Sequence, residues 1–229
     1  MGARSLHDTI KQIPRPKSLT EIAVEHIREA ITKGNFGLGQ HISESSLAAS
    51  LGISKTPVRE ALAQLKIEGL VKIFPQKGTF VFTMTEQEVI DICELRFTLE
   101  SAALKLALAR SKQEFLSDLR DVVAKMTAAH RENRKDEYLD LDADFHVLFF
   151  KHCGNQFLDD AYRLISARVA AVRTHLASVP HHMDKSFDEH VRMKQNIEND
   201  NVAEALNILV EHITRTKQSA SLHIPRYSL

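Results

Sequence analysis

Residues 43–81 read SESSLAASLGISKTPVREALAQLKIEGLVKIFPQKGTFV, and this stretch decides the fold of the N-terminal part of the chain. Ser43 is placed to cap a helix over 44–51, and Gly52 follows as a tight turn. A second helix is expected from Thr56 to about residue 68. A helix, a short glycine turn and a second helix are the helix-turn-helix pattern.

The residues around the second helix strengthen this prediction. Pro57 is expected at the first helical position, where its missing N–H costs nothing, and Gly69 stands where a C-terminal cap belongs. Strands are expected over 70–74 and 79–82, joined by a turn at 75–78. A β-hairpin directly after the second helix is typical of a winged helix-turn-helix.

Upstream of this motif, residues 19–33 (LTEIAVEHIREAITK) have the apolar spacing of one amphipathic helix. Ile22, Ile27 and Ile31 are expected to face inward. This helix supplies the third helical element that a small winged head needs for its core.

Glycine and proline place the domain boundary near residue 83. Seven of the eight glycines lie at or before Gly78, and no proline occurs between Thr85 and Val179. A segment of that length without proline favours helices. We therefore predict a mainly α protein: a winged helix-turn-helix in residues 1–83, with its core at about 18–83, and an all-α helical bundle in residues 84–229.

The bundle is expected to contain six helices. Thr85 and Glu88 form a capping box at the start of the first one. Apolar positions at helical spacing run from Val89 to Leu106 in this first helix. The same spacing and the breaks at Asn133, Gly154 and Pro180 predict five further helices over the ranges 112–132, 135–152, 155–178, 184–199 and 201–222.

Composition limits the class of protein. The 229 residues are 43% hydrophobic and 26% charged, as in soluble globular proteins, and no apolar run approaches a membrane span. The first twenty residues lack the apolar core of a secretion signal, and Cys93 and Cys153 are expected to be reduced thiols, so a cytoplasmic location is expected.

Residues 1–82 carry 11 Lys and Arg against 7 Asp and Glu, a net charge of +4, whereas residues 83–229 carry 19 against 23, a net charge of −4. A basic head on an acidic body suits a protein whose head meets an anion.

The predicted head presents the chemistry that DNA binding needs. Ser54, Lys55, Thr56 and Arg59 gather at the start of the second helix of the motif, where N–H groups and the helix dipole favour phosphate. Arg59 has the geometry to bind a guanine edge or a phosphate. The alternative is that these charges belong to an ordinary solvated face.

The whole stretch 43–81 resembles the DNA-binding domain of the GntR family of bacterial regulators, with the pattern SE..LA..LG.S.TPVREAL..L...GLV......G.FV. The resemblance implies that Ser54, Lys55, Thr56 and Arg59 contact double-stranded DNA, and that the wing around Lys77 and Gly78 enters the minor groove. This chain differs from the family at Lys55, where arginine is usual. Lysine keeps the charge but lacks the bidentate guanidinium, which affects the preference for one operator base.

The body is rich in histidine, with nine of the twelve histidines after residue 82. Asp142 and His146 stand four residues apart on a predicted helix, so they share a face and could bind one ion. His190 and His212 lie on later helices. A carboxylate and three imidazoles would suit Zn²⁺, Ni²⁺, Mn²⁺ or Fe²⁺. The spacing alone fits equally well with histidines that are ordinary surface or core residues.

The body also resembles the all-helical, FCD-type ligand-binding domain of the FadR-like subgroup. Its pattern is an Asp-x-x-x-His pair, a His within a Glu-His sequence, and a His about twenty residues later. The resemblance implies a metal site at Asp142, His146, His190 and His212. Open positions on the metal would accept a small organic acid. The arginines expected to neutralise that acid are Arg96, Arg168 and Arg173; a structural salt bridge, such as Arg96 with Glu100, is the alternative for each.

Two other features are expected to be uninvolved. His181 and His182 follow Pro180 and are expected to be a solvated pair in a loop, and the segment 224–227 is expected to be a frayed tail.

Taken together, the sequence predicts a homodimeric regulator, not an enzyme, that binds a pseudo-palindromic operator. A small carboxylate at the metal site is expected to change its DNA affinity, and repression is the expected sign. Two alternatives remain. One is a metal-dependent enzyme with an appended DNA-binding head; the other is a regulator whose metal is only structural, or is replaced by a direct ligand such as an acyl group.

Overall fold

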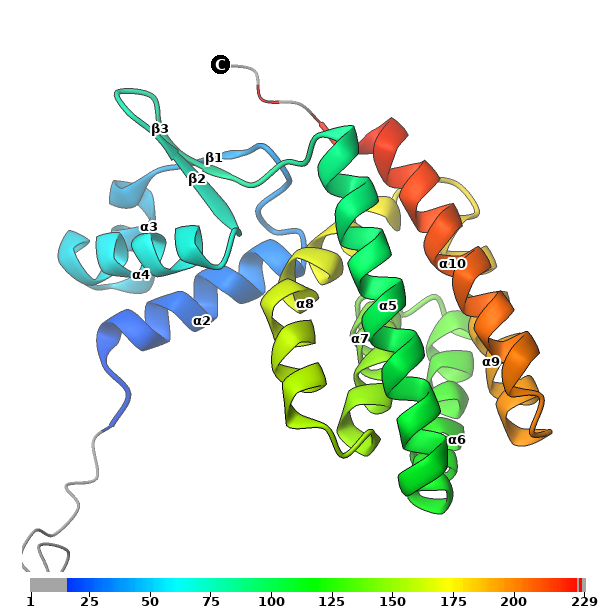
Figure 1. The fold of residues 1–229 in the computed structure, drawn as a ribbon. Helices are drawn as coiled ribbons and strands as arrows, with labels where there is room; N and C mark the ends of the chain where they lie inside the picture. Colours follow the sequence, from blue (N-terminus) through cyan, green and yellow to red (C-terminus); the bar gives the residue numbers. More distant parts are fainter. Residues whose placement is uncertain (1–15, 226, 228–229) are drawn as a thin grey trace, which may run out of the picture.

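The computed structural model describes residues 16–225 and residue 227, and its N-terminal head is a small α/β unit (Figure 1). Residues 1–15 of the predicted head lie outside this range. Within residues 16–83 the head contains three helices and three short strands: α2 (Leu19–Thr32), β1 (His41–Ile42), α3 (Glu44–Leu51), α4 (Lys55–Ile67), β2 (Val71–Phe74) and β3 (Gly78–Val81).

Local sequence explains these boundaries. Ser18 and Glu21 form a capping box at the start of α2, and Ser43 caps α3 by accepting from the backbone of Ser46. Helix α4 begins at Lys55, so Pro57 occupies its third position and not the first as predicted. This position still lies in the first turn, where N–H groups have no helical partner.

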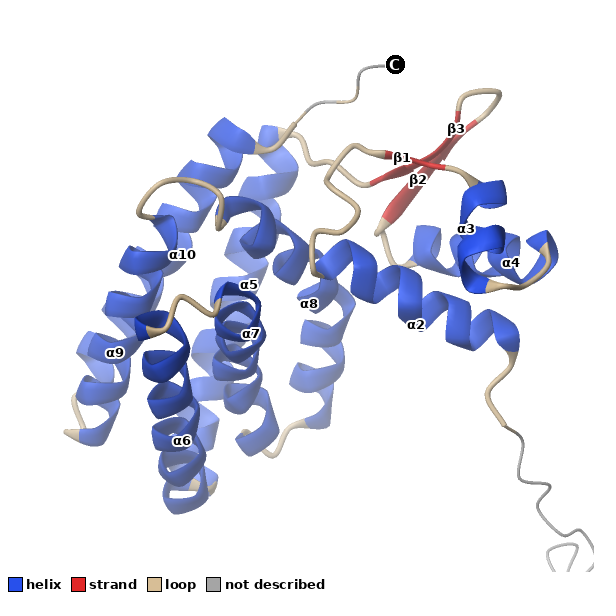
Figure 2. Cartoon of the chain, turned by 180° about the vertical axis from the view of Figure 1, so that it is seen from behind, coloured by secondary structure: helices blue, strands red, loops and turns tan. Residues whose placement is uncertain are grey.

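The wing is an antiparallel sheet in the order β1-β3-β2 (Figure 2). Phe80 of β3 stands opposite Lys72 of β2 on one side and His41 of β1 on the other. The hairpin of β2 and β3 confirms the predicted wing, whereas the two-residue strand β1 was not predicted from the sequence. The prediction for Ile22 was wrong, since it is 37% exposed, and Ala23 and Val24 of the same helix are buried instead.

Over residues 84–225 the body is a bundle of six helices, which confirms the predicted number and order (Figure 1). Their bounds are α5 (Glu86–Arg110), α6 (Lys112–Arg131), α7 (Lys135–His152), α8 (Gln156–Leu176), α9 (His182–Glu198) and α10 (Val202–His223). None of the described helices combines the length and apolarity that crossing a membrane requires.

The bundle core is aromatic next to its polar centre. The ring of Phe149 packs edge-on against Phe115 at 6.0 Å and Phe145 at 5.5 Å between centroids. Phe145 also contacts the imidazole of His190, at 4.3 Å between ring centroids. The apolar core of the bundle therefore forms one wall of the histidine group described below.

Head and body meet along two seams. The end of α2 lies against α8, where the Thr174 hydroxyl donates to the carbonyl of Thr32 at 2.7 Å. At the second seam, the backbone N–H of Thr83 donates to the hydroxyl of Tyr227 at 3.0 Å. The expectation of a frayed tail was therefore wrong for Tyr227, whose ring also packs edge-on against Phe74 at 5.1 Å between centroids.

Candidate nucleic-acid interface and metal centre

The start of α4 presents the predicted DNA-contacting side chains to solvent. Ser54, Lys55 and Thr56 are all exposed, and the Ser54 side chain makes no capping bond to the helix within the described part of the chain. Arg59 is 65% exposed and its Nε donates to Glu44 on α3 at 2.7 Å. These groups form a polar, mostly basic surface at a helix N-terminus, which is suited to phosphate.

The tip of the wing adds a second basic point. Lys77 is exposed, whereas Gly78 is partly covered and has a φ of 101°. A Cβ atom on Gly78 would lie 2.7 Å from Nε2 of His41, so a larger residue would collide with β1. Another residue would have to displace the His41 ring and would be strained at this φ, so the sheet favours glycine here whether or not this position contacts DNA.

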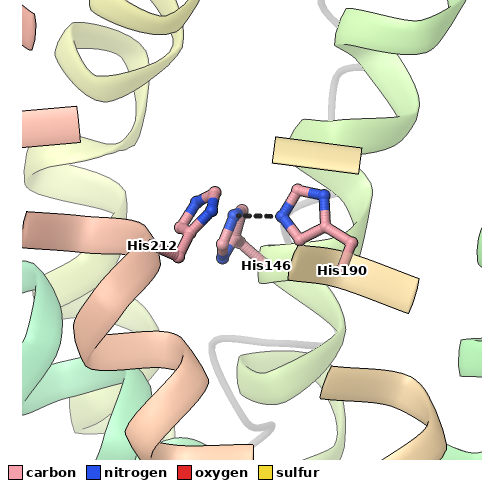
Figure 3. Close-up of side chains that lie close together, drawn as sticks. All are labelled: His146, His190 and His212. Atoms are coloured by element: carbon pink, nitrogen blue, oxygen red, sulfur yellow. Dashed lines mark hydrogen bonds between the residues drawn. The ribbon is translucent and has the colours of Figure 1, made fainter. Parts of the chain in front are cut away.

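Three histidines from three helices converge in the body (Figure 3). His146 lies on α7, His190 on α9 and His212 on α10, and one ring nitrogen of each lies within 4.8 Å of those of the other two. All three side chains are buried, and Nε2 of His146 lies 3.3 Å from Nε2 of His190. The structure therefore brings together three of the four predicted metal ligands.

Carboxylates contact the outer nitrogens of two of these rings. Glu100 Oε2 lies 2.8 Å from Nδ1 of His146, and Glu189 Oε2 lies 2.8 Å from Nδ1 of His212. A carboxylate accepts a hydrogen bond from a ring nitrogen that carries a proton. These two contacts therefore favour the tautomer with the proton on Nδ1. The lone pair then lies on Nε2, and a carboxylate on the outer ring nitrogen is the usual support of a metal-binding histidine.

Asp142 adjoins the histidine group but is directed elsewhere. Its Oδ2 accepts from Arg173 of α8, and its Oδ1 lies 3.6 Å from Nδ1 of His190. Ser186 donates weakly to the same Oδ1 at 3.4 Å. Asp142, the predicted fourth ligand, thus lies beside the histidine group, and its carboxylate is paired with Arg173.

The three predicted arginines separate into two places. Nη2 of Arg96 lies 2.9 Å from Nε2 of His146 and 3.4 Å from Nε2 of His212, while its Nε donates to Glu100 at 2.6 Å. Arg96 is therefore both at the histidine group and in the salt bridge that was its alternative.

Arg173 also reaches this centre, through Asp142, but Arg168 does not. Arg168 lies in a different cavity, between head and body, so grouping it with the other two was wrong. The two residues are five positions apart, which rotates their side chains by about 140° around α8.

Burial keeps the histidines neutral. It lowers the pKa of His190 to about 3, although Asp142 acts in the opposite direction. Burial, with Arg96 and Arg173, also lowers the pKa of His146 well below its usual value, and burial lowers that of His212. At neutral pH these rings therefore keep the lone pairs that a metal needs.

Two carboxyl groups at the centre, those of Asp142 and Glu189, have lowered pKa values and stay charged. Burial would raise the pKa of Asp142, but Arg173 and His190 hold it well below its usual range. Hydrogen bonds from Arg215 and His212 likewise overcome burial and lower the pKa of Glu189 to about 2. The centre thus combines neutral imidazoles with ionised carboxylates, a set of donors that fits a divalent transition metal.

Sequence reasoning missed Glu189, Arg215 and His182. Nη1 of Arg215 lies 3.0 Å from Nδ1 of His182, and its Nη2 donates to Glu189 at 2.6 Å. His182 is only 8% exposed, so the expectation of a solvated pair was wrong for it. The sequence contains one indication of the role of Glu189, which is its position directly before His190. Adjacent residues on a helix point in different directions, so Glu189 contacts other side chains than His190 does.

A winged helix-turn-helix joined to this helical body defines a class of protein, the DNA-binding transcription regulators. Two family models match the chain: "Bacterial regulatory proteins, gntR family" at residues 19–81 and "FCD domain" at residues 91–215. The chain belongs to the GntR family and has the FCD type of body.

Similar proteins agree with this assignment. The HTH-type transcriptional regulator YdhC of Bacillus subtilis is 26% identical over 81% of this chain and 84% of its own length. The HTH-type transcriptional repressor GlaR of Escherichia coli is 32% identical over 58% of this chain and 62% of its own length. A solved structure of a GntR regulator from Rhodococcus, 18% identical, shares the fold with a TM-score of 0.76 over 89% of this chain and 98% of the other. These are transcription regulators, in agreement with the prediction that this chain is not an enzyme.

Proposed function

We propose that the protein is a repressor whose affinity for operator DNA is controlled by a small organic acid bound beside a divalent transition metal, Zn²⁺, Ni²⁺, Mn²⁺ or Fe²⁺. In this proposal residues 1–83 bind the operator, and residues 84–229 bind the metal and the acid. The observation that carries the proposal is the convergence of His146, His190 and His212, with a carboxylate on the outer nitrogen of two of the rings. Repression as the sign rests on relatives such as GlaR, which is named a repressor.

The arginines supply the second half of the proposal. Arg96 and Arg173 are both buried. Arg96 contacts the ring of His146 directly, and Arg173 pairs with Asp142, which lies beside the histidine group. The three histidines, with Asp142, would hold the metal, which supplies a Lewis acid for an oxygen of the ligand. The guanidinium groups would neutralise the remaining charge of a carboxylate.

A homodimer is part of the same proposal. Phe157 and Leu164 of α8 are 87% and 75% exposed, and their spacing of seven residues places them on one face of the helix. Exposed apolar residues on one face favour contact with another protein surface, and a second copy would present two heads to a pseudo-palindromic operator. The Leu164→Lys variant is expected to shift the mass in sedimentation towards the monomer.

Elemental analysis of the purified chain tests the metal directly. About one metal ion per chain is expected in the wild type and in His26→Ala, which removes an exposed histidine of α2. His190→Ala is expected to lose the metal. Metal-free wild-type protein would contradict the metal half of the proposal and leave the DNA-binding half untouched.

A gel-shift series tests the acid. Operator affinity of the metal-loaded protein is expected to change when the correct small carboxylate is added, and this response is expected to vanish in Arg173→Met. Unchanged affinity across all small carboxylates would favour the alternative in which the metal is structural. That alternative also predicts that metal removal unfolds the body without changing DNA affinity of the folded fraction.

A further inference from the structure

A second cavity lies between the head and the body, at the seam beside β2. Its volume is about 540 Å³, which is within the range of small-molecule pockets. The head contributes residues of β2, including Lys72 and Phe74, and the body contributes residues of α5 and α8, including Ile92 and Arg168. The lining residues that the structure describes include no member of the histidine group.

Arg168 lines this cavity and has a buried polar atom that lacks a partner in the described part of the chain. Its Nε is buried, and among residues 16–225 and 227 no atom accepts a hydrogen bond from it. A Cβ atom on Gly69, at φ 73°, would lie 3.4 Å from Cδ and Nη1 of Arg168, so glycine lets the head backbone pack closely on this side chain. A buried charged donor without an acceptor is costly, and an anion in the cavity would remove that cost.

The other charged residues of the cavity differ from Arg168: Asp91 accepts from Gln87 at 2.7 Å, and the side chain of Lys66 is exposed to solvent. Glu88 accepts from the backbone N–H of Thr85 at 2.7 Å as part of the cap of α5. Lys72 lies 3.9 Å from Glu88 and 5.5 Å from the centre of the Tyr227 ring. Arg168 therefore carries the buried donor of this cavity that has no partner among the described residues, whereas the Lys66 side chain lies in solvent.

The walls of the cavity are largely apolar. Phe74 and Ile73 line it from the wing, Ile92 from α5 and Ile165 from α8. Such walls favour a ligand whose uncharged part is apolar, because its transfer from water is then favourable.

We propose that this cavity between head and body binds an organic anion with an apolar body, such as an aromatic carboxylate or sulfonate, and that Arg168 binds its charged group. The site is separate from the metal centre, and the proposal does not depend on the proposed function. An occupant contacts β2 of the wing and α5 of the body at once, so its binding free energy depends on how the two parts are placed.

Fluorescence titration of the full chain with 8-anilinonaphthalene-1-sulfonate tests the site, because this probe combines an anion with aromatic rings. The wild type is expected to bind it, and Arg168→Met to bind it about tenfold more weakly, as the loss of one charge-assisted hydrogen bond predicts. Arg163→Met is the matched control, since Arg163 lies on the same helix, is 70% exposed and pairs with Asp159. It is expected to leave the affinity unchanged.

Two further measurements locate the probe. The uncharged analogue N-phenyl-1-naphthylamine is expected to bind the wild type and Arg168→Met equally, because it carries no group for the guanidinium. Ile73→Trp, which narrows the cavity from the head side, is expected to weaken both probes.

The metal centre is separated from this result by repeating the titration with His190→Ala and with a chelator, neither of which is expected to change the affinity. No binding of the sulfonate by the wild type would overturn the proposal. Equal affinities of Arg168→Met and the wild type for the sulfonate would also overturn it. So would an Ile73→Trp variant that binds both probes as tightly as the wild type.

Discussion

At the scale of single residues, Glu189 joins two other side chains of the body, His212 and Arg215. It accepts from His212 at 2.8 Å and from two nitrogens of Arg215 at 2.6 and 2.7 Å. As a positioning residue it would fix the His212 tautomer without contacting a metal. Such outer carboxylates commonly contribute to metal affinity.

The Glu189→Gln variant is therefore expected to bind Zn²⁺ about tenfold more weakly, because a neutral amide orients the imidazole less strongly. Competition with a chromophoric chelator measures this affinity. Glu211→Gln, on α10 directly before His212, is the control, since Glu211 is 60% exposed and its ion pair with Arg192 is long, at 3.7 Å. An equal loss in both variants, or none in either, would contradict the role given to Glu189.

Lys55 belongs to the same scale on the DNA side. It is exposed at the start of α4 and is expected to contact a phosphate or a base edge. If it neutralises one phosphate, Lys55→Ala reduces the slope of log affinity against log salt by about 1. Fluorescence anisotropy with an operator selected from random DNA measures this slope. Lys105→Ala, on an exposed position of α5, should leave it unchanged; a slope that changes equally in both variants would place Lys55 outside the interface.

The wing and the C-terminal segment are coupled at the scale of elements. Tyr227 packs against Phe74 and Phe80 of the wing and accepts from the backbone of Thr83. It follows α10, the helix that carries His212, by four residues after His223. The position of the wing is thus linked to a helix of the histidine group through a short segment.

Tyr227→Ala is expected to speed amide hydrogen exchange in β2 and β3 while leaving α6 unchanged, because both ring contacts and the hydrogen bond are lost. Tyr227→Phe keeps the rings and should have a smaller effect, of about 1 kcal/mol or less from the lost hydrogen bond. Mass spectrometry after exchange resolves the peptides. Unchanged protection of the wing in Tyr227→Ala would show that this contact contributes nothing to the wing.

Sequence periodicity predicted the helices well because each one is specified locally. The capping box of Thr85 and the absence of proline fixed α5 and the helices after it to within a few residues. Strand β1 was missed because two residues carry no pattern, and its pairing with β3 is a tertiary contact. The exposed Ile22 was misplaced because a single period of 3.6 fits more than one apolar stripe.

The site divides in the same way. Spacing on one helix and the family resemblance indicated His146, His190 and His212, which the structure brings together. The partners of these rings could not be predicted, because they depend on how neighbouring helices are rotated. Thus Glu189 serves the histidine of another helix, and Arg168 faces the head and not Asp142.

A basic head and an acidic body act together at the scale of the whole molecule. The charges of +4 over residues 1–82 and −4 over residues 83–229 direct DNA to the head and away from the body. A signal from the histidine group reaches the head through the contacts between the two parts. These include Thr174 with Thr32, Thr83 with Tyr227, and the packing of Gly69 on Arg168.

Metal binding should be visible in the stability of the whole chain, because an ion bound only by the folded state stabilises that state by mass action. At a free Zn²⁺ concentration of about 100 times Kd the gain is about 2.7 kcal/mol, which raises Tm by about 5–10 °C for a chain of this size. Scanning calorimetry with and without a chelator measures the shift. His190→Ala is expected to lose most of it and His26→Ala to keep it, since only the first removes a ring of the buried group. A full shift in His190→Ala would place the ion elsewhere. A wild-type shift without any change in operator affinity would mean that the ion stabilises the bundle and does not regulate the head.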